Sequence, residues 1–229
     1  MKKKRVLFKL SGELLIGNGP VDEERVLALC KVLTELTEIA EIAVVTGAGN
    51  IVRGKNWTEK VLADEVGMLA TFVNARALYN GIYIASGGKV PCRIYAPFEV
   101  GGVARRFDPV EGRDFIRDGI IIFAGGTGNP LFTTDTVAVI RAVQLEVDFL
   151  AKGTKVDGLY TADPEKEKDA EFIPEATYDE VIQKRLAVLD LVAFELAREN
   201  NLQIRIFNAT RFDNLKLLLE DKVKYSIVH

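Results

Sequence analysis

The chain has 229 residues, and its 30 basic and 33 acidic side chains give a formal net charge of −3 at pH 7. This balance argues against a nucleic-acid-binding surface as the main function, because such surfaces carry a large excess of positive charge. The only histidine is His229, and the two cysteines, Cys30 and Cys92, are far apart. The composition therefore argues against Ser-His-Asp, Cys-His and His-metal chemistry, and we predict no metal ligands among the side chains.

Hydrophobic residues make up 48% of the chain, enough for the core of one large α/β domain or two smaller ones. The basic start, Met1–Arg5, is followed by an apolar run that Lys9 interrupts too early for a signal peptide. The longest uncharged stretch, Gly119–Thr134, has 16 residues and contains glycine and proline, so it is too short to cross a bilayer. We expect a cytoplasmic protein with reduced cysteines and no membrane contact.

Strands and helices alternate along the whole sequence. Short, continuously apolar runs indicate strands covered on both faces, and apolar residues at helical spacing indicate the helices between them. In chain order, the expected elements are a strand at 6–10, a helix at 22–38, a strand at 42–45, a helical region at 58–86, a strand at 92–95, a helix at 110–117, a strand at 120–124, a helix ending near 145, a strand at 148–152, helices at 177–184 and 190–199, a strand at 204–207 and a helix at 212–219. This order predicts βαβ crossovers and a three-layer αβα sandwich with a mostly parallel central sheet.

Two segments depart from the regular alternation. The helical region 58–86 contains Gly67 and Gly81, near which we expect it to break. The segment 152–174 is polar and irregular, and we expect it to form a hairpin-like excursion over the sheet.

Three glycine-bearing loops follow predicted strands, where open α/β sheets bind their ligands. They are Ser11–Gly12, Gly47–Asn50 and Gly125–Asp135. The third loop joins a buried strand to an amphipathic helix and ends in two hydroxyls and a carboxylate. Its backbone N–H groups and the helix N-terminus can therefore bind an anion. Three such turns on one edge of the sheet predict a ligand with several phosphates.

Lys9 stands near the end of the first predicted strand, on the same side as Leu7 and opposite Phe8. A buried ammonium group is unfavourable unless it meets an anion. Lys9 could therefore reach a transferring phosphoryl group, or it could be an edge-strand lysine that extends to water.

The segment Gly49–Asn56 almost matches a P-loop. It ends in Asn56, which lacks the hydroxyl that binds Mg²⁺, so we reject a P-loop. The dinucleotide-binding pattern also fails, because Val52 stands where that pattern needs glycine. What remains is a short glycine turn followed by Arg53, which either clamps a phosphate through its planar guanidinium or is a solvated loop arginine.

Asp135 follows two threonines, which are ordinary residues at the start of a helix. An aspartate beside phosphates must be offset by Lys, Arg or Mg²⁺, so Asp135 could orient Lys9 or hold the water shell of a metal. A second polar cluster, Lys152–Gly158, follows a strand and suits either a ligand site or a β-turn. Tyr160–Pro164 could cover an adenine ring and its ribose, or form a turn.

Lysines, an arginine, an aspartate and glycine loops, without an internal histidine, suit phosphoryl transfer, in which catalysis is mostly positioning and charge neutralisation. An acceptor that is itself a phosphate or a carboxylate is already anionic, so no general base is needed. The sequence therefore favours a kinase with an anionic acceptor.

Several motifs occur in order from about residue 5 to the C-terminus. They are Lys9–Glu13, Gly47–Gly54, Gly67–Thr71, Gly128–Asp135 and Thr154–Pro164, followed by Asp190–Arg198 and Ile204–Asn208. Together they closely resemble the bacterial-type UMP kinases, which belong to the amino acid kinase family. The resemblance implies transfer of a phosphoryl group from ATP to UMP, which makes UDP in pyrimidine nucleotide biosynthesis.

The resemblance also implies roles for individual residues. The ATP site would be formed by Lys9, Leu10, Ser11, Gly12, Gly49, Arg53, Thr154, Tyr160 and Asp163. The UMP site would be formed by Ala48, Asp64, Thr127, Gly128, Asn129, Pro130, Leu131, Phe132, Thr133 and Thr134. The catalytic residues would be Lys9, Arg53, Asp135 and Lys155. On this basis, residues 1–229 form one domain with an acceptor-nucleotide part at about 1–150 and an ATP-binding part at about 151–229.

The family further implies Mg²⁺ bound with ATP, a homohexamer, and GTP and UTP as effectors. The sequence departs from the family pattern in three places. Ala48 stands where the family usually has a third glycine, so we expect a negative φ or an altered turn there. The loop Ile16–Pro20 is short, which argues against activation by GTP, and the stretch Phe98–Asp118 matches the family poorly.

Two alternatives remain open. One is a kinase of the same fold that acts on a carboxylate or a carbamate, against which Asp64 and the segment Gly128–Thr134 argue. The other is a nucleotide-binding sensor or storage protein without turnover, which would not need both Lys9 and Asp135.

Overall fold

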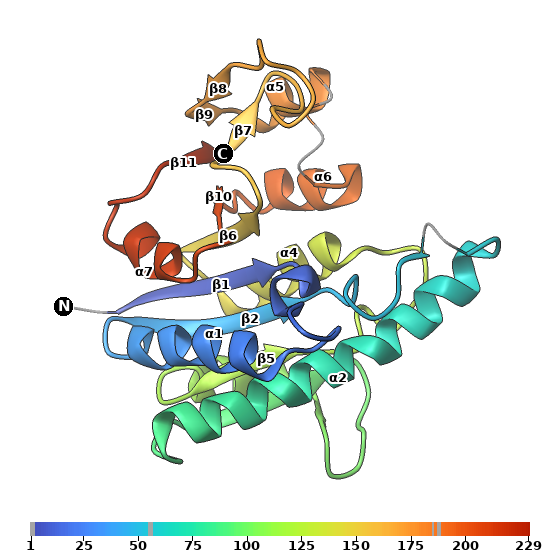
Figure 1. Cartoon of the computed structure of the whole chain (residues 1–229), viewed down its shortest axis with the longest axis vertical. Coiled ribbons are helices and arrows are strands. Elements are labelled where there is room, and N and C mark those ends of the chain that lie inside the picture. Colours follow the sequence, from blue (N-terminus) through green and yellow to red (C-terminus); the bar gives the residue numbers. More distant parts are fainter. Residues whose placement is uncertain (1–2, 55–56, 185, 187–188) are drawn as a thin grey trace.

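A single large sheet runs through the molecule. The computed structural model describes residues 3–54, 57–184, 186 and 189–229, and nine strands within them form this sheet (Figure 1). In order across the sheet they are β4 (Arg105–Arg106), β3 (Cys92–Ala96), β5 (Ile120–Phe123), β2 (Ala40–Thr46), β1 (Lys4–Leu10), β6 (Phe149–Thr154), β10 (Ile204–Asn208), β11 (Tyr225–Val228) and β9 (Glu175–Ala176). Neighbouring strands are parallel except β10 and β11, which are antiparallel. The predicted mostly parallel sheet is therefore confirmed.

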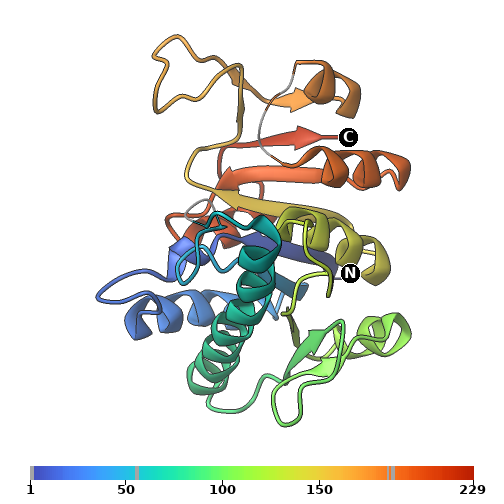
Figure 2. The same ribbon diagram turned by 90° about the vertical axis from the view of Figure 1, so that its right-hand side faces the viewer.

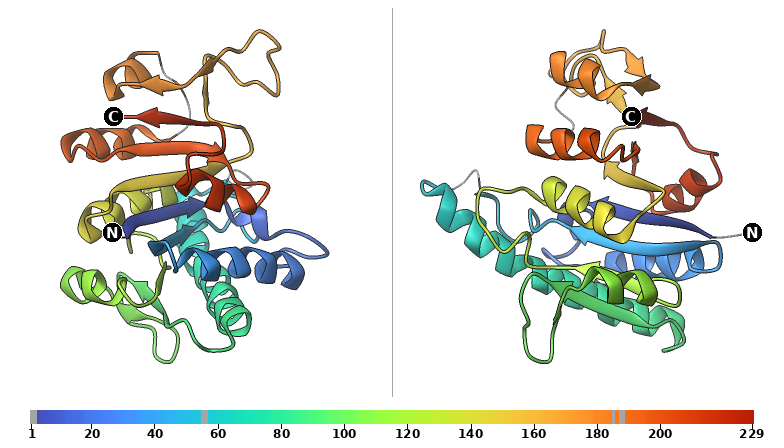
Figure 3. Two further views of the ribbon diagram at one scale, coloured as in Figure 1. Left: turned by 90° about the vertical axis from the view of Figure 1, so that its left-hand side faces the viewer. Right: turned by 180° about the vertical axis from the view of Figure 1, so that it is seen from behind.

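Helices cover both faces of the sheet. One face carries the short 3₁₀ helix η1 (Gly12–Leu15) with α1 (Glu23–Leu36), α2 (Lys60–Ser86) and α7 (Asp213–Leu219), and the other carries α3 (Pro109–Phe115), α4 (Thr134–Leu145), α5 (Tyr178–Gln183) and α6 (Leu191–Glu199). Figure 1 shows α1 and α2 in front of the sheet, and the right panel of Figure 3 shows α3 and α4 from behind. Each face has its own apolar core, which confirms the three-layer αβα arrangement.

The strand β1 lies in the middle of the sheet, between β2 and β6. Val6 and Phe8 point to the core under α1 and α2, whereas Leu7 points to the core under α4. Lys9 therefore points toward α4, as alternation predicts, and the register of the sheet pairs it with Lys152 of β6. The interpretation of Lys9 as an edge-strand lysine is wrong, because strands flank β1 on both sides.

The helix α2 runs for 27 residues without interruption, so the breaks predicted near Gly67 and Gly81 are wrong. A Cβ atom at Gly81 would lie 2.7 Å from Sγ of Cys30 and 2.9 Å from Cγ1 of Val26, both on α1. Gly81 thus allows α1 and α2 to pack closely, whereas Gly67 has open space where a Cβ would lie. Neither α2 nor any other helix in the described part of the chain has the length and apolarity needed to cross a membrane.

The segment after β6 leaves the sheet, as predicted. It contains a two-stranded antiparallel hairpin of β7 (Leu159–Tyr160) and β8 (Phe172–Ile173), which Figure 2 shows in orange at the top of the molecule. The two-residue strands β4 and β9 are not predicted from the sequence, because so short a strand has no recognisable alternation.

Replacing Gly81 and Gly67 with alanine should change stability in opposite directions. Gly81→Ala forces a methyl group against Cys30 and Val26, so the free energy of unfolding should fall by about 1–3 kcal/mol. Gly67→Ala meets no atom within 4 Å and favours the helix, so the free energy of unfolding should rise by about 0.5–1 kcal/mol. Urea denaturation followed by circular dichroism measures both variants, and equal effects would contradict the close packing of α1 on α2.

Candidate active site

The three predicted glycine loops meet at the carboxyl edge of the sheet. A Cβ atom at Gly12 would lie 2.4 Å from the backbone oxygen of Gly47 and 2.3 Å from Oδ1 of Asn50, so the first two loops are in contact. The buried Asn74 of α2 holds them together, because its Nδ2 donates to the oxygen of Gly47 at 2.8 Å and its amide pairs with that of Asn50 at 2.9 Å. A Cβ atom at Gly47 would lie 3.3 Å from Oγ1 of Thr134, which belongs to the third loop.

Asp135 lies in the first turn of α4, between two lysines from the adjacent strands β1 and β6. Its Oδ1 atom is 2.7 Å from Nζ of Lys9, and its Oδ2 atom accepts a hydrogen bond of 2.5 Å from Nζ of Lys152. The three side chains are only 10–14% exposed. This geometry fits the hypothesis that Asp135 orients Lys9, and it adds Lys152 as a second cation.

The charges of this cluster influence one another. Burial alone would raise the pKa of Asp135, but Lys9 and Lys152 outweigh it, so that pKa lies below the ordinary value of an aspartate. Burial, together with the charge of Lys9, lowers the pKa of Lys152 to about 8 against the opposing effect of Asp135. Two ammonium groups around one carboxylate leave an excess of positive charge at neutral pH, which can attract an anionic ligand.

Asp190 fixes the start of α4 from the neighbouring helix α6. Its carboxylate accepts hydrogen bonds from Oγ1 of Thr133 and, at 3.0 Å, from Oγ1 of Thr136. It also caps α6 by accepting from the backbone N–H of Ala193 at 2.8 Å. Thr133 in turn caps α4, because its Oγ1 accepts from the N–H of Asp135 at 3.1 Å. The position of Asp135 therefore depends on Asp190 as well as on the lysines.

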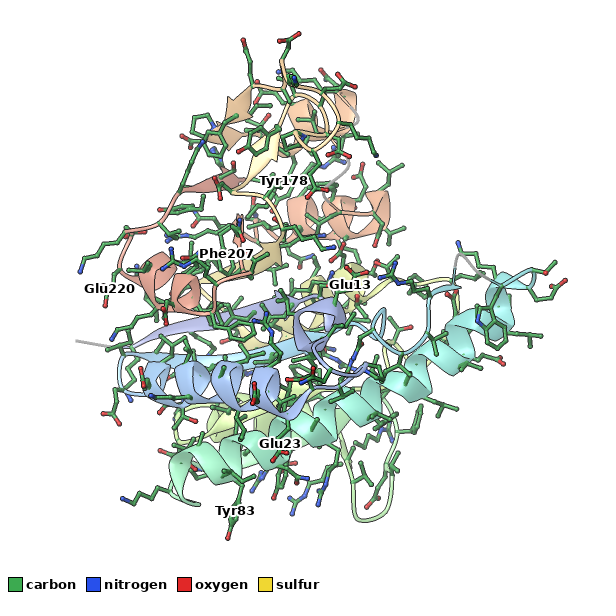
Figure 4. All side chains as sticks on the ribbon, viewed as in Figure 1. Glu13, Glu23, Tyr83, Tyr178, Phe207 and Glu220 are labelled. Carbon is green, nitrogen blue, oxygen red and sulfur yellow. The ribbon has the colours of Figure 1, made fainter. Side chains whose placement is uncertain are left out.

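A second carboxylate with two cations lies nearer the surface. Glu13 of η1, labelled in Figure 4, has Oε1 2.8 Å from Nη2 of Arg53 and Oε2 2.9 Å from Nζ of Lys155. Arg53 also donates from Nε to the backbone oxygen of Gly49 at 3.3 Å. Glu13 thus brings together two of the predicted catalytic residues, Arg53 and Lys155, which come from loops far apart in the sequence.

A cavity of about 210 Å³ lies between the N-terminal half of α2 and the loop before α4. The predicted acceptor-site residues that line it are Ala48, Asp64, Leu131, Phe132, Thr133 and Thr134. Asp64 is held at its wall, because Oδ2 accepts from the N–H of Leu131 at 2.8 Å. Thr127, Gly128, Asn129 and Pro130 do not line this cavity. They form the preceding turn, in which Oγ1 of Thr127 donates to the backbone oxygen of Asn129 at 2.9 Å.

The backbone of the loop between β5 and α4 differs from that of the loop after β2. Gly125, Gly126 and Gly128 have φ values of 74°, 61° and 84°, which glycine adopts without steric cost. Ala48 is not among the described residues with a positive φ, so the negative φ expected at this position is confirmed. Alanine therefore fits the second loop without backbone strain.

A second cavity, of about 360 Å³, lies beneath the excursion that follows β6. Lys155, predicted as a catalytic residue, lines it together with Tyr160 and Asp163 of the predicted ATP site. Tyr160 packs edge-to-face on Phe172 of β8, with 5.4 Å between the ring centroids. Thr154 does not line the cavity, and its Oγ1 donates to the backbone oxygen of a neighbouring loop residue at 2.6 Å.

The predicted ATP-site residues after β1 have mainly backbone roles. The side chain of Leu10 is buried in the core under α1, so only its backbone is available to a ligand. Ser11 caps η1 by accepting from the N–H of Glu13 at 3.2 Å, and Gly12 is the first residue of that helix. Asn56, where the rejected P-loop match ends, lies outside the described residues.

Comparison with known proteins agrees with this architecture. Residues 4–208 match the sequence pattern of the amino acid kinase family. The chain belongs to the amino acid kinase family. It is 39% identical over 236 residues to the uridylate kinase of Bacteroides thetaiotaomicron, covering 100% of this chain and 99% of that one. It is 36% identical over 233 residues to the uridylate kinase of Colwellia psychrerythraea, covering 98% of this chain and 93% of that one.

Solved structures of this amino acid kinase fold superpose along the whole chain. The crystal structure of UMP kinase from Ureaplasma parvum matches with a TM-score of 0.93 and 30% identity, covering 100% of this chain and 99% of that one. The UMP kinase from Bacillus anthracis matches with a TM-score of 0.88 and 28% identity, covering 99% of this chain and 96% of that one.

The sequence motifs include three further charged residues of this amino acid kinase site, Lys152, Glu13 and Asp190, but assign none of them a role of its own. Lys152 lies near the end of an apolar strand, as Lys9 does, so the unfavourable burial of its ammonium group is the signal that could have identified it. Glu13 and Asp190 give no such signal. An acidic residue in the first turn of a helix, or just before it, is an ordinary helix-start residue until its partners are known.

Removing the buried carboxylate should destabilise the protein far more than removing an exposed one. Asp135→Asn leaves two buried ammonium groups without their counter-ion, so the free energy of unfolding should fall by about 3 kcal/mol at pH 7. The matched control, Asp163→Asn, breaks an exposed pair with Lys166 at 2.9 Å and should cost far less, because water screens that pair. Urea denaturation compares the two, and similar losses would contradict a special role for the buried cluster.

Proposed function

We propose that the chain transfers the γ-phosphoryl group of ATP to UMP and so makes UDP. The relatives and solved structures that match along its length are named uridylate kinase or UMP kinase, which confirms the assignment made from the sequence motifs. The observation in the structure that carries the proposal is the buried set of Lys9, Asp135 and Lys152 at the N-terminus of α4. Two ammonium groups held beside a helix N-terminus suit a phosphoryl group in transfer.

The chemistry needs no general base. The attacking oxygen belongs to the phosphate of UMP, which is already anionic, and the chain has no histidine other than His229. Lys9 and Lys152 would neutralise the charge that develops on the transferring group, and Asp135 would keep both ammonium groups at a fixed separation. Because these groups are already fixed in the folded protein, they need little rearrangement when the substrates bind.

The two cavities support the proposal that one part of the chain binds UMP and another part binds ATP. We assign the cavity lined by Asp64 and Leu131 to UMP, because it adjoins the glycine loop and the start of α4. We assign the cavity lined by Tyr160 and Asp163 to the adenosine of ATP. Glu13 links Arg53 to Lys155, which lines the second cavity. The acceptor part is then about residues 1–150 and the ATP part about 151–229.

Mg²⁺ would enter with ATP and assist by neutralising the phosphate oxygens. The donor set fits a metal held by the nucleotide, because Asp135, Glu13 and Asp190 already contact lysines, an arginine or hydroxyl groups. Within the described residues, no three Asp, Glu, His or Cys side chains gather in a way that could hold a metal ion. The side chains of this site therefore act on the phosphates themselves.

Lys9→Met should lower the turnover of UMP phosphorylation by at least about 10³-fold, because it removes one of the two buried ammonium groups. ADP release in a coupled assay measures the rate, and near-normal turnover would contradict the role of Lys9. The same assay with UMP, CMP, carbamate and amino acids tests the wider proposal. Phosphorylation of a carboxylate or carbamate instead of UMP, or binding of ATP and UMP without UDP formation, would overturn it.

Activity should decline above pH 8 as Lys152 loses its proton. Since the pKa of Lys152 is lowered to about 8, its positive charge is complete well below that pH and is lost as the pH rises through it. The value of kcat/KM for ATP, which reports on the free enzyme, should fall by up to about tenfold per pH unit above pH 8. The Lys152→Gln variant should have a lower kcat/KM for ATP that does not change with pH over this range. A flat wild-type profile up to pH 9.5 would contradict the role of Lys152.

We propose that the protein assembles as a homohexamer in the cytoplasm, as the family resemblance implies. An exposed apolar stripe on α2 supports self-association, and it consists of Leu62, Val66, Leu69 and Val73 at helical spacing. Farther along α2, the exposed Tyr83 points away from the molecule at the lower edge of Figure 4. We also propose GTP and UTP as effectors, and this proposal rests only on the resemblance to the family.

Leu69→Glu should reduce the assembly to smaller species, because it introduces a charge into the middle of the stripe. Ile39→Glu is the matched control, since Ile39 is also exposed but lies in the turn after α1. Light scattering coupled to size-exclusion chromatography measures the mass of each variant. A monomeric wild type, or a Leu69→Glu variant with the wild-type mass, would contradict assembly through α2.

A further inference from the structure

Glu13 occupies an unusual position for a carboxylate. It bridges Arg53 and Lys155, with distances of 2.8 Å and 2.9 Å from its two oxygens. Its backbone is fixed by the cap on η1, because Oγ of Ser11 accepts from its N–H at 3.2 Å. Through Glu13, the short helix η1 thus contacts Arg53 in the loop after β2 and Lys155 in the loop after β6.

The bridge is too exposed to contribute much to stability. The side chains of Glu13, Arg53 and Lys155 are 26%, 46% and 61% exposed. Exposed ion pairs add little to the free energy of folding, because water and salt screen the charges. A bridge of this kind can also exchange easily, since a phosphate carries more charge than a carboxylate and presents more oxygens to an arginine.

The two clusters of the site have the same composition. Each consists of one carboxylate between two cations, Asp135 with Lys9 and Lys152, and Glu13 with Arg53 and Lys155. The first is buried, and its carboxylate is tied to the start of α4. The second is open to solvent and lies where the proposed ATP phosphates would arrive.

We propose that Glu13 is a positioning residue that substitutes for a nucleotide phosphate. Between turnovers, its carboxylate holds Arg53 and Lys155 at the site and prevents their mutual repulsion. When ATP binds, the phosphates replace the carboxylate, and when the product leaves, Glu13 takes the cations back. This inference rests on the proposed function, because it requires ATP phosphates to bind beside Arg53 and Lys155.

The proposal predicts that removing the charge of Glu13 tightens nucleotide binding. Glu13→Gln keeps the size of the side chain but no longer competes with phosphates for the two cations. The Kd of the Mg²⁺ complex of the β,γ-imido analogue of ATP should fall by about three- to tenfold at low salt. The difference from wild type should shrink as salt is added. In turnover, KM for ATP should fall, and kcat should fall if release of ADP limits the rate, because Glu13 no longer displaces the product phosphates from the two cations.

Two controls isolate the effect. Glu23→Gln makes the same change of charge at an exposed position in the first turn of α1, also labelled in Figure 4, and should leave the Kd unchanged. The double variant Arg53→Gln/Lys155→Gln removes the two cations that Glu13 contacts at 2.8 Å and 2.9 Å. Adding Glu13→Gln to it should produce much less further tightening than in the wild type, because the carboxylate no longer competes with phosphates for these two cations.

Isothermal titration calorimetry of the full chain without UMP gives each Kd independently of turnover. An unchanged or weaker Kd in Glu13→Gln overturns the inference, and so does tightening that persists in the double-variant background. If the wild type binds the analogue but makes no UDP from ATP and UMP, the proposed function fails while the Kd comparison still decides the role of Glu13. If the wild type does not bind the analogue, both proposals fail.

Discussion

The site depends on one carboxylate held between two lysines. Asp135 lies in the first turn of α4, and Lys9 and Lys152 reach its two oxygens from adjacent central strands. Without the carboxylate, the two buried ammonium groups would lack a counter-ion and would repel each other. The same contacts tie a helix to the edge of the sheet. Charge balance and the local fold are therefore maintained by the same three side chains.

The parts of this arrangement with a local pattern can be predicted from the sequence. Continuous apolar runs identify the central strands, and an alternating position within one of them assigns Lys9 to the correct face of the sheet. Glycines followed by threonines identify the loop before α4 and its role at a helix N-terminus. Each of these features depends on a few consecutive residues, so the chain reveals it without any knowledge of its tertiary contacts.

The rest depends on contacts between distant segments. Lys152 has the same local pattern as Lys9, but the polar residues after it also suit a turn, and only the pairing of β1 with β6 shows the two lysines side by side. Glu13 has an ordinary helix-start position until Arg53 and Lys155 are seen beside it. Gly81 suggests a helix break because glycine has a low helix propensity, which is a local property. Its actual role is to leave room for α1, and this contact cannot be seen in the sequence around Gly81.

The register of β1 against β6 has a consequence for folding. Lys9 and Lys152 are paired and both face α4 in the observed register, and a shift of one strand by one residue would turn its side chains to the opposite face. A lysine displaced in this way would be buried among apolar side chains without a counter-ion. The two lysines that we propose to act on the substrate phosphates therefore also favour the native pairing of the central strands, because a fold with these strands one residue out of register is less stable.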